Sequence, residues 1–307
     1  MNFRYLDELI HNGALEVVLD CDIAFDDGQE YSDGIMVDVD GLVINGNGHT
    51  IDARGKAGIF KCIGKGIIMK DLTFKNAFLF DNCCAIHNTG ELVLINCRFI
   101  GNANESNVWG GAIFNDGEMA VEKCSFEENS TSNEGGAIKN YGRLTISQSV
   151  FMRNSACDGG AIFNFRRGNL KLVDSTFIAN EASSSTGNDI VNRGKIAVQD
   201  CVEFSLNGIA NEGFIIASQD ILDTVSNSGT MAELNGILTW RISGIVLPPL
   251  VLTDVVVDHI AEGLPEAALE LGDLAGLGVV DVRADQREDK DQIKKDVQHG
   301  LFSFSWM

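Results

Sequence analysis

Short runs in which apolar residues occupy every second position recur along most of the chain. They are Leu92-Val93-Leu94, Met119-Ala120-Val121, Leu144-Thr145-Ile146, Leu170-Lys171-Leu172 and Ile196-Ala197-Val198. Each run is followed by a Phe-x-x-Asn motif, at Phe99/Asn102, Phe126/Asn129, Phe151/Asn154, Phe177/Asn180 and Phe204/Asn207. Such short alternating runs predict β-strands. Their recurrence predicts a repeat architecture.

A glycine-rich motif opens the repeats. Gly110-Gly111-Ala112-Ile113-Phe114-Asn115-Asp116-Gly117 returns at residues 135–142 and 159–164, and a weaker copy occupies residues 84–90. Its Asn-x-Gly part continues at Asn192, Asn211 and Asn227. Starting from Asn88, the steps between successive asparagines are 27, 25, 24, 28, 19 and 16 residues. A period in this range is typical of a solenoid.

Three strands per repeat predict an all-β protein, a right-handed single-stranded parallel β-helix with three strands per coil. Equivalent positions would stack about 4.8 Å apart along the axis. We expect the glycine of Asn-x-Gly to supply a positive φ at the bend. We also expect two columns of asparagine to form side-chain amide ladders: Asn88, Asn115, Asn140, Asn164, Asn192 and Asn211 in one, and Asn102, Asn129, Asn154, Asn180 and Asn207 in the other.

The two ends depart from the repeat. Phe3, Leu6, Leu9 and Ile10 have helical spacing. We therefore predict a short capping helix within residues 1–14, because an uncovered strand edge would pair with other chains. The β-helix is predicted over residues 15–240. Residues 241–307 are predicted to form an irregular tail or second cap, with a candidate helix at residues 265–271.

The paired Gly-Gly-Ala-Ile and Phe-x-x-Asn motifs resemble the repeats of chlamydial polymorphic membrane proteins. They also resemble the adhesin-like right-handed β-helix proteins of methanogenic archaea. Residues 44–52 resemble the first coils of pectin-lyase-like β-helices. The resemblance covers residues 35–230 and implies an adhesion or glycan-contacting module at the cell surface or secreted. The opening residues lack the apolar region of a signal peptide, so this location is implied by the resemblance alone.

Charge and composition argue against some classes of binding partner. The formal net charge of -21 argues against nucleic acid, because phosphate binding needs clustered Lys and Arg. The longest apolar run is too short to span a membrane as a helix. The eight cysteines lack zinc-site spacing, and we expect no cofactor and no metal. Cys97 and Cys124 occupy equivalent slots, where stacking would exceed the usual disulfide separation, so we predict two free, buried thiols.

Candidate catalytic groups are sparse, and no catalytic residue is predicted. Acidic pairs occur at Asp20/Asp22, Asp26/Asp27 and Asp38/Asp40. They could hold a cation or act on a glycan, but solvated strand faces explain them more simply. Arg54 and Lys56 are interpreted as surface charge, and His49 as a structural histidine. His87 shares a slot with Phe114, Lys139 and Phe163, and this tolerance favours an outward-facing position.

We predict a non-enzymatic, adhesin-like protein that binds a surface glycan or a partner-cell protein through exposed loops. The predicted ligand-binding residues are Trp109, Asn107, Arg166 and Arg167. An exposed Trp ring can stack on a sugar, and the two arginines are an insertion in an Asn-x-Gly bend. Two alternatives stay open: a polysaccharide lyase or hydrolase of the pectin-lyase-like fold, and a structural spacer. Nothing in the sequence fixes an oligomeric state.

Overall fold

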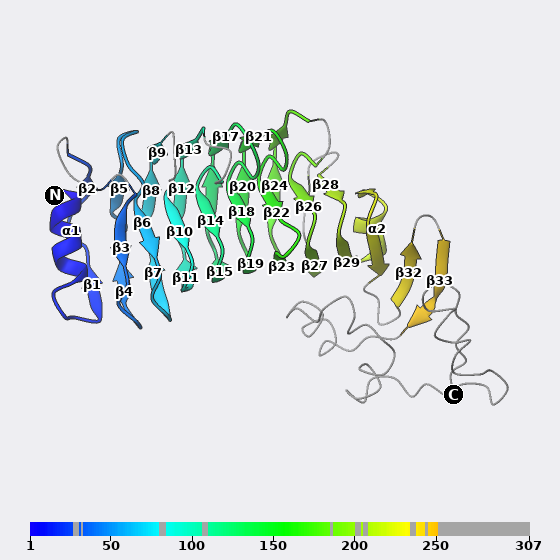
Figure 1. The fold of residues 1–307 in the computed structure, drawn as a ribbon, viewed down its shortest axis with the longest axis horizontal. Helices are drawn as coiled ribbons and strands as arrows, with labels where there is room; N and C mark the ends of the chain where they lie inside the picture. The colour runs from blue at the N-terminus through cyan, green and yellow to red at the C-terminus, as the bar shows by residue number, and fades with distance from the viewer. Residues whose placement is uncertain are drawn as a thin grey trace.

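The computed structural model is a parallel β-helix, an elongated stack of coils with helix α1 (Phe3–Ile10) at one end (Figure 1). It describes residues 1–26, 31, 33–79, 84–105, 110–184, 187–199, 204, 208–233, 238–242 and 245–250. For residues 79, 233 and the last two ranges, only the backbone is described. The predicted all-β parallel solenoid with a short N-terminal helix is confirmed.

Each full coil runs through four sheets in the order in which we number them. Sheet 1 contains β3 (Ile35–Val37), β6 (Phe60–Cys62), β10 (Ile86–Asn88), β14 (Ile113–Asn115), β18 (Ile138–Asn140), β22 (Ile162–Asn164), β26 (Ile190–Asn192), β28 (Ile209–Asn211) and β30 (Ser226–Asn227). Sheet 2 contains β1 (Glu16–Val18), β4 (Val43–Asn45), β7 (Ile67–Lys70), β11 (Glu91–Ile95), β15 (Glu118–Glu122), β19 (Arg143–Ser147), β23 (Asn169–Val173), β27 (Lys195–Gln199), β29 (Phe214–Ala217), β31 (Thr230–Glu233), β32 (Leu238–Ile242) and β33 (Ile245–Leu250).

The other two sheets have shorter strands. Sheet 3 contains β2 (Ile23–Ala24), β5 (Thr50–Asp52), β8 (Thr73–Lys75), β12 (Arg98–Ile100), β16 (Ser125–Glu127), β20 (Val150–Met152) and β24 (Thr176–Ile178). Sheet 4 contains β9 (Phe78–Leu79), β13 (Ala103–Asn104), β17 (Ser130–Thr131), β21 (Ser155–Ala156) and β25 (Glu181–Ala182). The sequence does not predict sheet 4, because its two-residue strands are too short to carry an alternating pattern and are held by backbone pairing.

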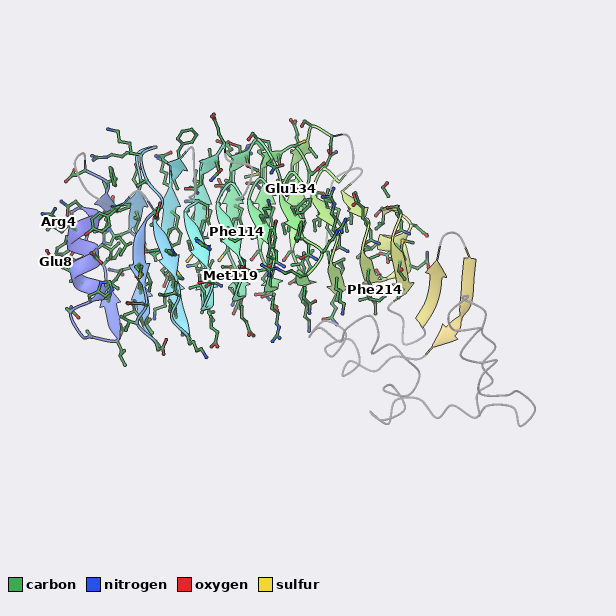
Figure 2. The ribbon with its side chains drawn as sticks, in the orientation of Figure 1. Arg4, Glu8, Phe114, Met119, Glu134 and Phe214 are labelled. Atoms are coloured by element: carbon green, nitrogen blue, oxygen red, sulfur yellow. The ribbon has the colours of Figure 1, made fainter. Side chains whose placement is uncertain are left out.

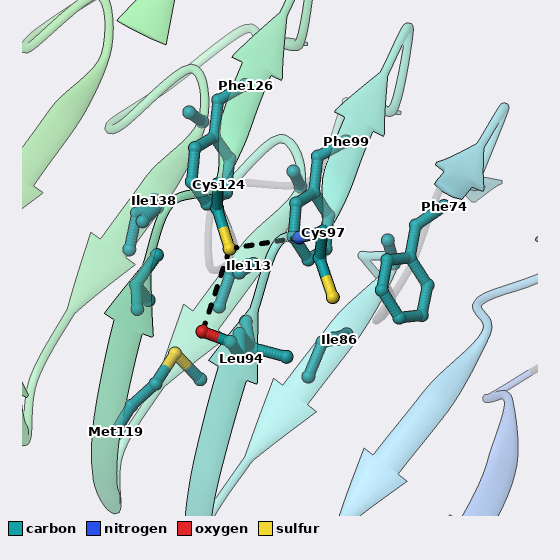
Figure 3. Close-up of a cluster of buried hydrophobic side chains, with 14 of the residues drawn as sticks. Phe74, Ile86, Leu94, Cys97, Phe99, Ile113, Met119, Cys124, Phe126 and Ile138 are labelled. Atoms are coloured by element: carbon teal, nitrogen blue, oxygen red, sulfur yellow. Dashed lines mark hydrogen bonds between the residues drawn. The ribbon is translucent and has the colours of Figure 1, made fainter. Parts of the chain in front are cut away.

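The interior is filled by columns of identical or similar side chains. The Phe-x-x-Asn phenylalanines stack from Phe74 through Phe99, Phe126, Phe151 and Phe177 to Phe204, with neighbouring ring centroids 4.6–5.1 Å apart. Sheet 1 contributes a column of isoleucines, including Ile86, Ile113 and Ile138, which lie in the same cluster (Figure 3). The inward-facing residues of the alternating runs therefore form one continuous core.

Cys97 and Cys124 lie in this core as buried free thiols, as predicted (Figure 3). They do more than fill space, because the backbone N–H of Cys97 donates to Cys124 Sγ at 3.3 Å. In the next coil the N–H of Cys124 donates to Ser149 Oγ at 3.1 Å. Hydrogen bonding to Cys124 and burial raise the pKa of the Cys97 thiol. At this position of the coil, the side chain of one residue accepts a hydrogen bond from the backbone N–H of the equivalent residue in the preceding coil. Either Cys or Ser can serve as the acceptor.

The glycine of Asn-x-Gly is needed for a different reason from the one predicted. The residues with positive φ do not include Gly90, Gly117 or Gly142. Instead, a Cβ on Gly117 would lie 2.2 Å from the carbonyl oxygen of Gly90 in the preceding coil, and one on Gly142 would lie 2.0 Å from that of Gly117. The expectation of a positive φ is wrong at these positions, and the requirement is close backbone approach between stacked coils.

Positive φ occurs at other corners, mostly at residues other than glycine. Between sheets 2 and 3 each corner contains a left-handed residue other than glycine: Asn47, which Gly48 follows with a second positive φ, then Asp71, Asn96, Lys123, Gln148 and Asp174. Between sheets 3 and 4 the same role falls to Asn76, Gly101, Glu128, Arg153 and Ala179. The first glycine of Gly-Gly also has a positive φ at Gly135 and Gly159. The left-handed conformation at these corners cannot be predicted from the sequence, because the residue type differs from coil to coil.

The chain departs from parallel coiling at both described ends of the stack. The Asn2 side chain accepts a hydrogen bond from the N–H of Tyr5 and caps α1, while Phe3, Leu6 and Ile10 are buried against the first coil. At the far end, after α2 (Gln219–Leu222), β31 pairs antiparallel with β32 and β32 pairs antiparallel with β33. Parallel coiling therefore ends at β31 in the described chain. Most of the tail predicted from residue 241 lies outside the described residues.

Candidate functional site

The corner between sheets 1 and 2 is built on the first asparagine column. Each Asn-x-Gly asparagine donates its Nδ2 to the Oδ1 of the next, in the series Asn88, Asn115, Asn140, Asn164, Asn192, Asn211 and Asn227, at 2.6–2.8 Å. The same Nδ2 atoms also approach backbone carbonyls within their own coil and the next, as at Gly117 and Arg143 for Asn115. This buried ladder fixes the spacing and orientation of every residue on the corner.

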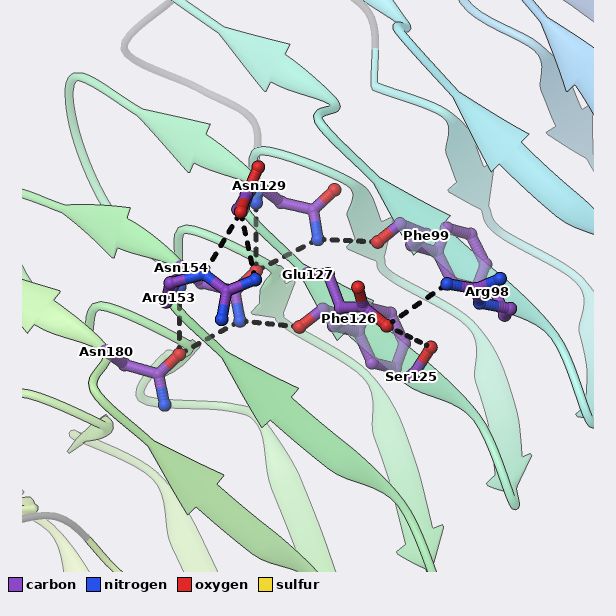
Figure 4. Close-up of polar contacts among 10 residues, drawn as sticks. Arg98, Phe99, Ser125, Phe126, Glu127, Asn129, Arg153, Asn154 and Asn180 are labelled. Carbon is purple, nitrogen blue, oxygen red and sulfur yellow. Dashed lines mark hydrogen bonds and ion pairs between the residues drawn. The ribbon is translucent and has the colours of Figure 1, made fainter.

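The second asparagine column closes the corner between sheets 3 and 4 (Figure 4). Asn102, Asn129 and Asn154 each donate Nδ2 to the next amide oxygen at 2.9 Å. Asn180 donates instead to Asp189 Oδ1 at 2.9 Å. The predicted last member, Asn207, lies outside the described residues. Apart from the exposed Asn227, both columns are almost fully buried, so they support the fold and leave binding to the side chains outside them.

An open groove of about 390 Å³ runs across the coils at the Asn-x-Gly corner. We call it the corner groove. It is lined by Ile63, Lys65, Thr89, Gly90, Glu91, Gly117, Glu118 and Arg143. The glycines contribute no side chains, and their close stacking leaves the charged first residues of the sheet 2 strands as its walls. Its volume lies within the range of small-ligand sites, about 300–1,000 Å³.

The walls of the corner groove carry charges of both signs. Glu91, Glu118 and Arg143 are in register as the first residues of β11, β15 and β19. Arg143 Nη1 lies 3.5 Å from Glu118 Oε1, and both side chains are more than half exposed. An exposed pair of this kind contributes little to stability, about 0–1 kcal/mol. The two groups therefore remain available to an incoming ligand.

Arg166 and Arg167 stand at the C-terminal side of the corner groove. They occupy a tight turn closed by a 2.7 Å hydrogen bond from the N–H of Gly168 to the carbonyl oxygen of Phe165. Arg167 reaches back across two coils to Asp116, with Nη2 and Oδ1 2.6 Å apart. Arg166 is exposed. Of the predicted ligand-binding residues, these two lie together beside the groove, while Trp109 and Asn107 lie outside the described residues.

A column of rings underlies Arg167. Tyr141 stacks on Phe165 with centroids 4.2 Å apart, and it lies 5.3 Å from the ring of Phe114. The guanidinium of Arg167 lies 5.3 Å from the Tyr141 centroid, a favourable cation–π contact. Because the rings stack along the helix axis, their faces contact one another. They hold the Arg167 turn in place rather than offering a flat platform to a sugar.

The slot of His87 lies on the outer face of sheet 1, as predicted, but in the following coils it is covered. Phe114 is 7% exposed, Lys139 2% and Phe163 0%. Figure 2 shows Phe114 and Glu134 over the middle coils. Glu134 Oε2 lies 2.9 Å from Lys139 Nζ, and Glu134 Oε1 lies 3.4 Å from Arg193 Nη1. The loop that precedes Gly-Gly folds over the outer face of sheet 1, which the sequence pattern does not reveal.

Burial also changes the acid–base behaviour of His87. Its ring lies 5.3 Å from that of Phe114. Desolvation, with a smaller contribution from the charge of Lys61, lowers the pKa of His87 to about 4. The ring is therefore neutral at physiological pH and carries no charge that a ligand could use.

The other candidates from the sequence have structural partners. His49 Nδ1 lies 3.1 Å from Asp22 Oδ1, which also accepts from the N–H of Thr50. Asp38 lies beside His11, and Asp40 accepts from the N–H of Lys65 at 2.7 Å. Arg54 donates to the carbonyl oxygen of Phe25 at 3.1 Å. Within the described ranges, no group of three or more His, Cys, Asp or Glu side chains is placed to hold a metal ion.

Comparison with known protein families finds a match for one stretch of the chain. Residues 123–141 match the Chlamydia polymorphic membrane protein repeat. This repeat spans β16, β17 and β18 and ends at Tyr141, beside the corner groove. No curated protein and no solved structure is significantly similar to the chain.

The matched polymorphic membrane protein repeat forms a regular coil of the β-helix, with Phe126 in the phenylalanine column and Asn129 and Asn140 in the two amide ladders. The motifs that carried the resemblance are therefore the ones that build the fold. In the part of the chain that the structure describes, no helix is long and apolar enough to cross a membrane.

Proposed function

We propose that this protein is a surface-exposed, adhesin-like β-helix that binds a glycan or a partner-cell surface along the corner groove. The polymorphic membrane protein repeat and the parallel β-helix favour an outer-surface role. The observation that carries the binding site is the interruption of the repeat at residues 165–168. There the three-residue Asn-x-Gly bend gains two residues, and both are arginines.

This interruption has the features of a binding element. A ladder that needs only Asn and Gly at this corner does not require Arg166 or Arg167. Arg167 is 62% exposed although it is held by Asp116 and Tyr141. Held in this way, it loses less conformational freedom when a ligand binds, which favours affinity. Trp109 and Asn107 remain predicted contacts on the loop before Gly110.

The test is binding of the full chain to a glycan array and to intact cells. The double variant Arg166→Ala and Arg167→Ala is expected to lose at least tenfold in binding. Its matched control changes Arg98 and Arg153, which are exposed, paired with Glu127 and Glu128, and lie on the sheet 3 side. Equal loss in the two double variants would show that only net charge matters and would refute the site.

Polysaccharide cleavage is the second candidate, and one feature of the corner groove favours it. Glu91 and Glu118 are in register on adjacent coils with Arg143 beside them, and glycosidases use two facing carboxylates. New reducing ends or unsaturated products from acidic polysaccharides, abolished by Glu91→Gln with Glu118→Gln, would establish an enzyme. Binding without products keeps the adhesin-like proposal, and a chain that neither binds nor cleaves would be a spacer.

A further inference from the structure

One buried amide on the corner has unusual surroundings. Asn169, the first residue of β23, is 9% exposed, and neither its Nδ2 nor its Oδ1 has a hydrogen-bond partner among the described residues. Buried side-chain amides are nearly always hydrogen-bonded. The ladder amides described above satisfy this rule in neighbouring coils, so the exception at Asn169 calls for a specific cause.

The position of Asn169 continues the wall of the corner groove. It is in register with Arg143 of β19 on one side and Lys195 of β27 on the other. It directly follows the turn that carries Arg166 and Arg167. The column therefore passes from Glu91 and Glu118 through Arg143 and Asn169 to Lys195. Its charge changes from negative to positive at Arg143, one coil before the repeat is interrupted.

The backbone around Asn169 is held from both sides. The ladder amide of Asn164 donates to the carbonyl oxygens of Gly168 at 3.2 Å and Lys195 at 2.9 Å. The N–H of Asn169 donates to the carbonyl oxygen of Gly142 at 2.9 Å. These bonds fix the backbone at Asn169, while the polar atoms of its buried side chain have no partner among the described residues. Fixed polar groups without internal partners are the arrangement that binding sites use to recognise a ligand.

We propose that Asn169, together with Arg143, Arg166 and Lys195, binds a carboxylated sugar at the C-terminal end of the corner groove. The inference rests on the proposed surface-binding function and names its ligand class. A carboxylate accepts from Arg and from the amide Nδ2. The amide Oδ1 needs a donor, which a sugar hydroxyl beside the carboxylate supplies and a bare carboxylate or phosphate diester does not.

The polar atoms of Asn169 are buried, so neighbouring side chains must move for the ligand to reach them. The nearby side chains of Arg143 and Arg166 are long, flexible and exposed. A long polyanion such as nucleic acid is disfavoured, because the net charge of -21 repels it away from this cluster. A short acidic glycan places its charge only where the cations lie.

The experiment compares Asn169→Leu with the natural chain. Leu has a similar size and removes the unpaired amide, so the thermal unfolding midpoint is expected to rise. Binding of glucuronate, measured by NMR saturation transfer and titration, is expected to fall at least tenfold. Glucose, which lacks the carboxylate, and acetate, which lacks the hydroxyls, are expected to bind the natural chain at least tenfold more weakly than glucuronate.

The outcomes separate this inference from the proposed function. Unchanged glucuronate binding by the Asn169→Leu variant overturns the role of Asn169. Acetate binding as well as glucuronate would show a simple anion site and overturn the sugar class. Cell or array binding that requires Arg166 and Arg167 but is unaffected by Asn169→Leu would refute this inference and leave the adhesin-like function standing. Absence of all binding would refute both.

Discussion

The glycines of the Asn-x-Gly corner lie where one coil's backbone approaches the next. Gly117→Ala places a methyl group against the Gly90 carbonyl, at 2.2 Å before relaxation. We expect the variant to lose about 2–3 kcal/mol of unfolding free energy, as overpacked sites do. Gly48→Ala is the contrasting control, since Gly48 has φ +83 and open space around it, and should cost about 1 kcal/mol. Urea denaturation measures both, and a smaller loss at Gly117 would contradict the close-approach explanation.

The buried ring of His87 makes stability depend on pH. Its pKa is about 4 in the folded protein and near 6.5 when unfolded. Between these values the unfolded state binds more protons, so stability falls as the pH drops from about 6.5 towards 4. Allowing for partial exposure, we expect a loss of about 1 kcal/mol. The variant His87→Phe, which copies Phe114 of the next coil, should lack this component when urea midpoints at pH 7 and pH 4.5 are compared. An identical pH dependence in both proteins would refute it.

Single residues also mark the limit of sequence-based prediction. The structural roles of the asparagines, phenylalanines and Gly-Gly pairs can be predicted because the same residue type recurs from coil to coil. The left-handed corners do not, because Asn96, Lys123 and Gln148 share a backbone conformation and no chemistry. Arg166 and Arg167 are visible as an insertion. Asn169 gives no signal in the sequence, since its distinction is that its buried amide has no hydrogen-bond partner among the described residues.

The loop over sheet 1 is the element that the repeat pattern does not predict. It is held by Lys139, which replaces the phenylalanine of neighbouring coils, and by its pairing with Glu134. Glu134→Ala leaves the ammonium group buried without its carboxylate and should cost about 3 kcal/mol. Lys139→Phe removes the charge and restores the neighbouring residue type, so it should be neutral or stabilising.

The double variant tests whether these two effects share one cause. In Glu134→Ala with Lys139→Phe, the lost stability should return, because no buried charge remains. Chemical denaturation of the four proteins gives the coupling energy directly. If the double variant is as unstable as Glu134→Ala alone, the loop is held by other contacts and this explanation of the covered slot is wrong.

At the scale of the whole molecule, a regular scaffold carries an irregular element at residues 165–168. The amide ladders, the phenylalanine column and the glycine corner repeat from coil to coil, so they specify the β-helix and could be predicted from spacing. The corner groove could not, because it arises from side chains that come into register only when coils stack. Glu91, Glu118, Arg143, Asn169 and Lys195 are separated in sequence and form one column in the structure.

The central claim is that binding belongs to the interruption of the repeat and not to the repeat itself. Deleting Arg166 and Arg167 joins Asn164-Phe165 to Gly168 and restores the Asn-x-Gly bend of the other coils. Because neighbouring coils fold with this bend, the thermal unfolding midpoint should be unchanged or higher. Binding of the deletion variant to intact cells or to the glycan array should fall at least tenfold relative to the natural chain. A folded deletion variant that binds as tightly as the natural chain would contradict the account.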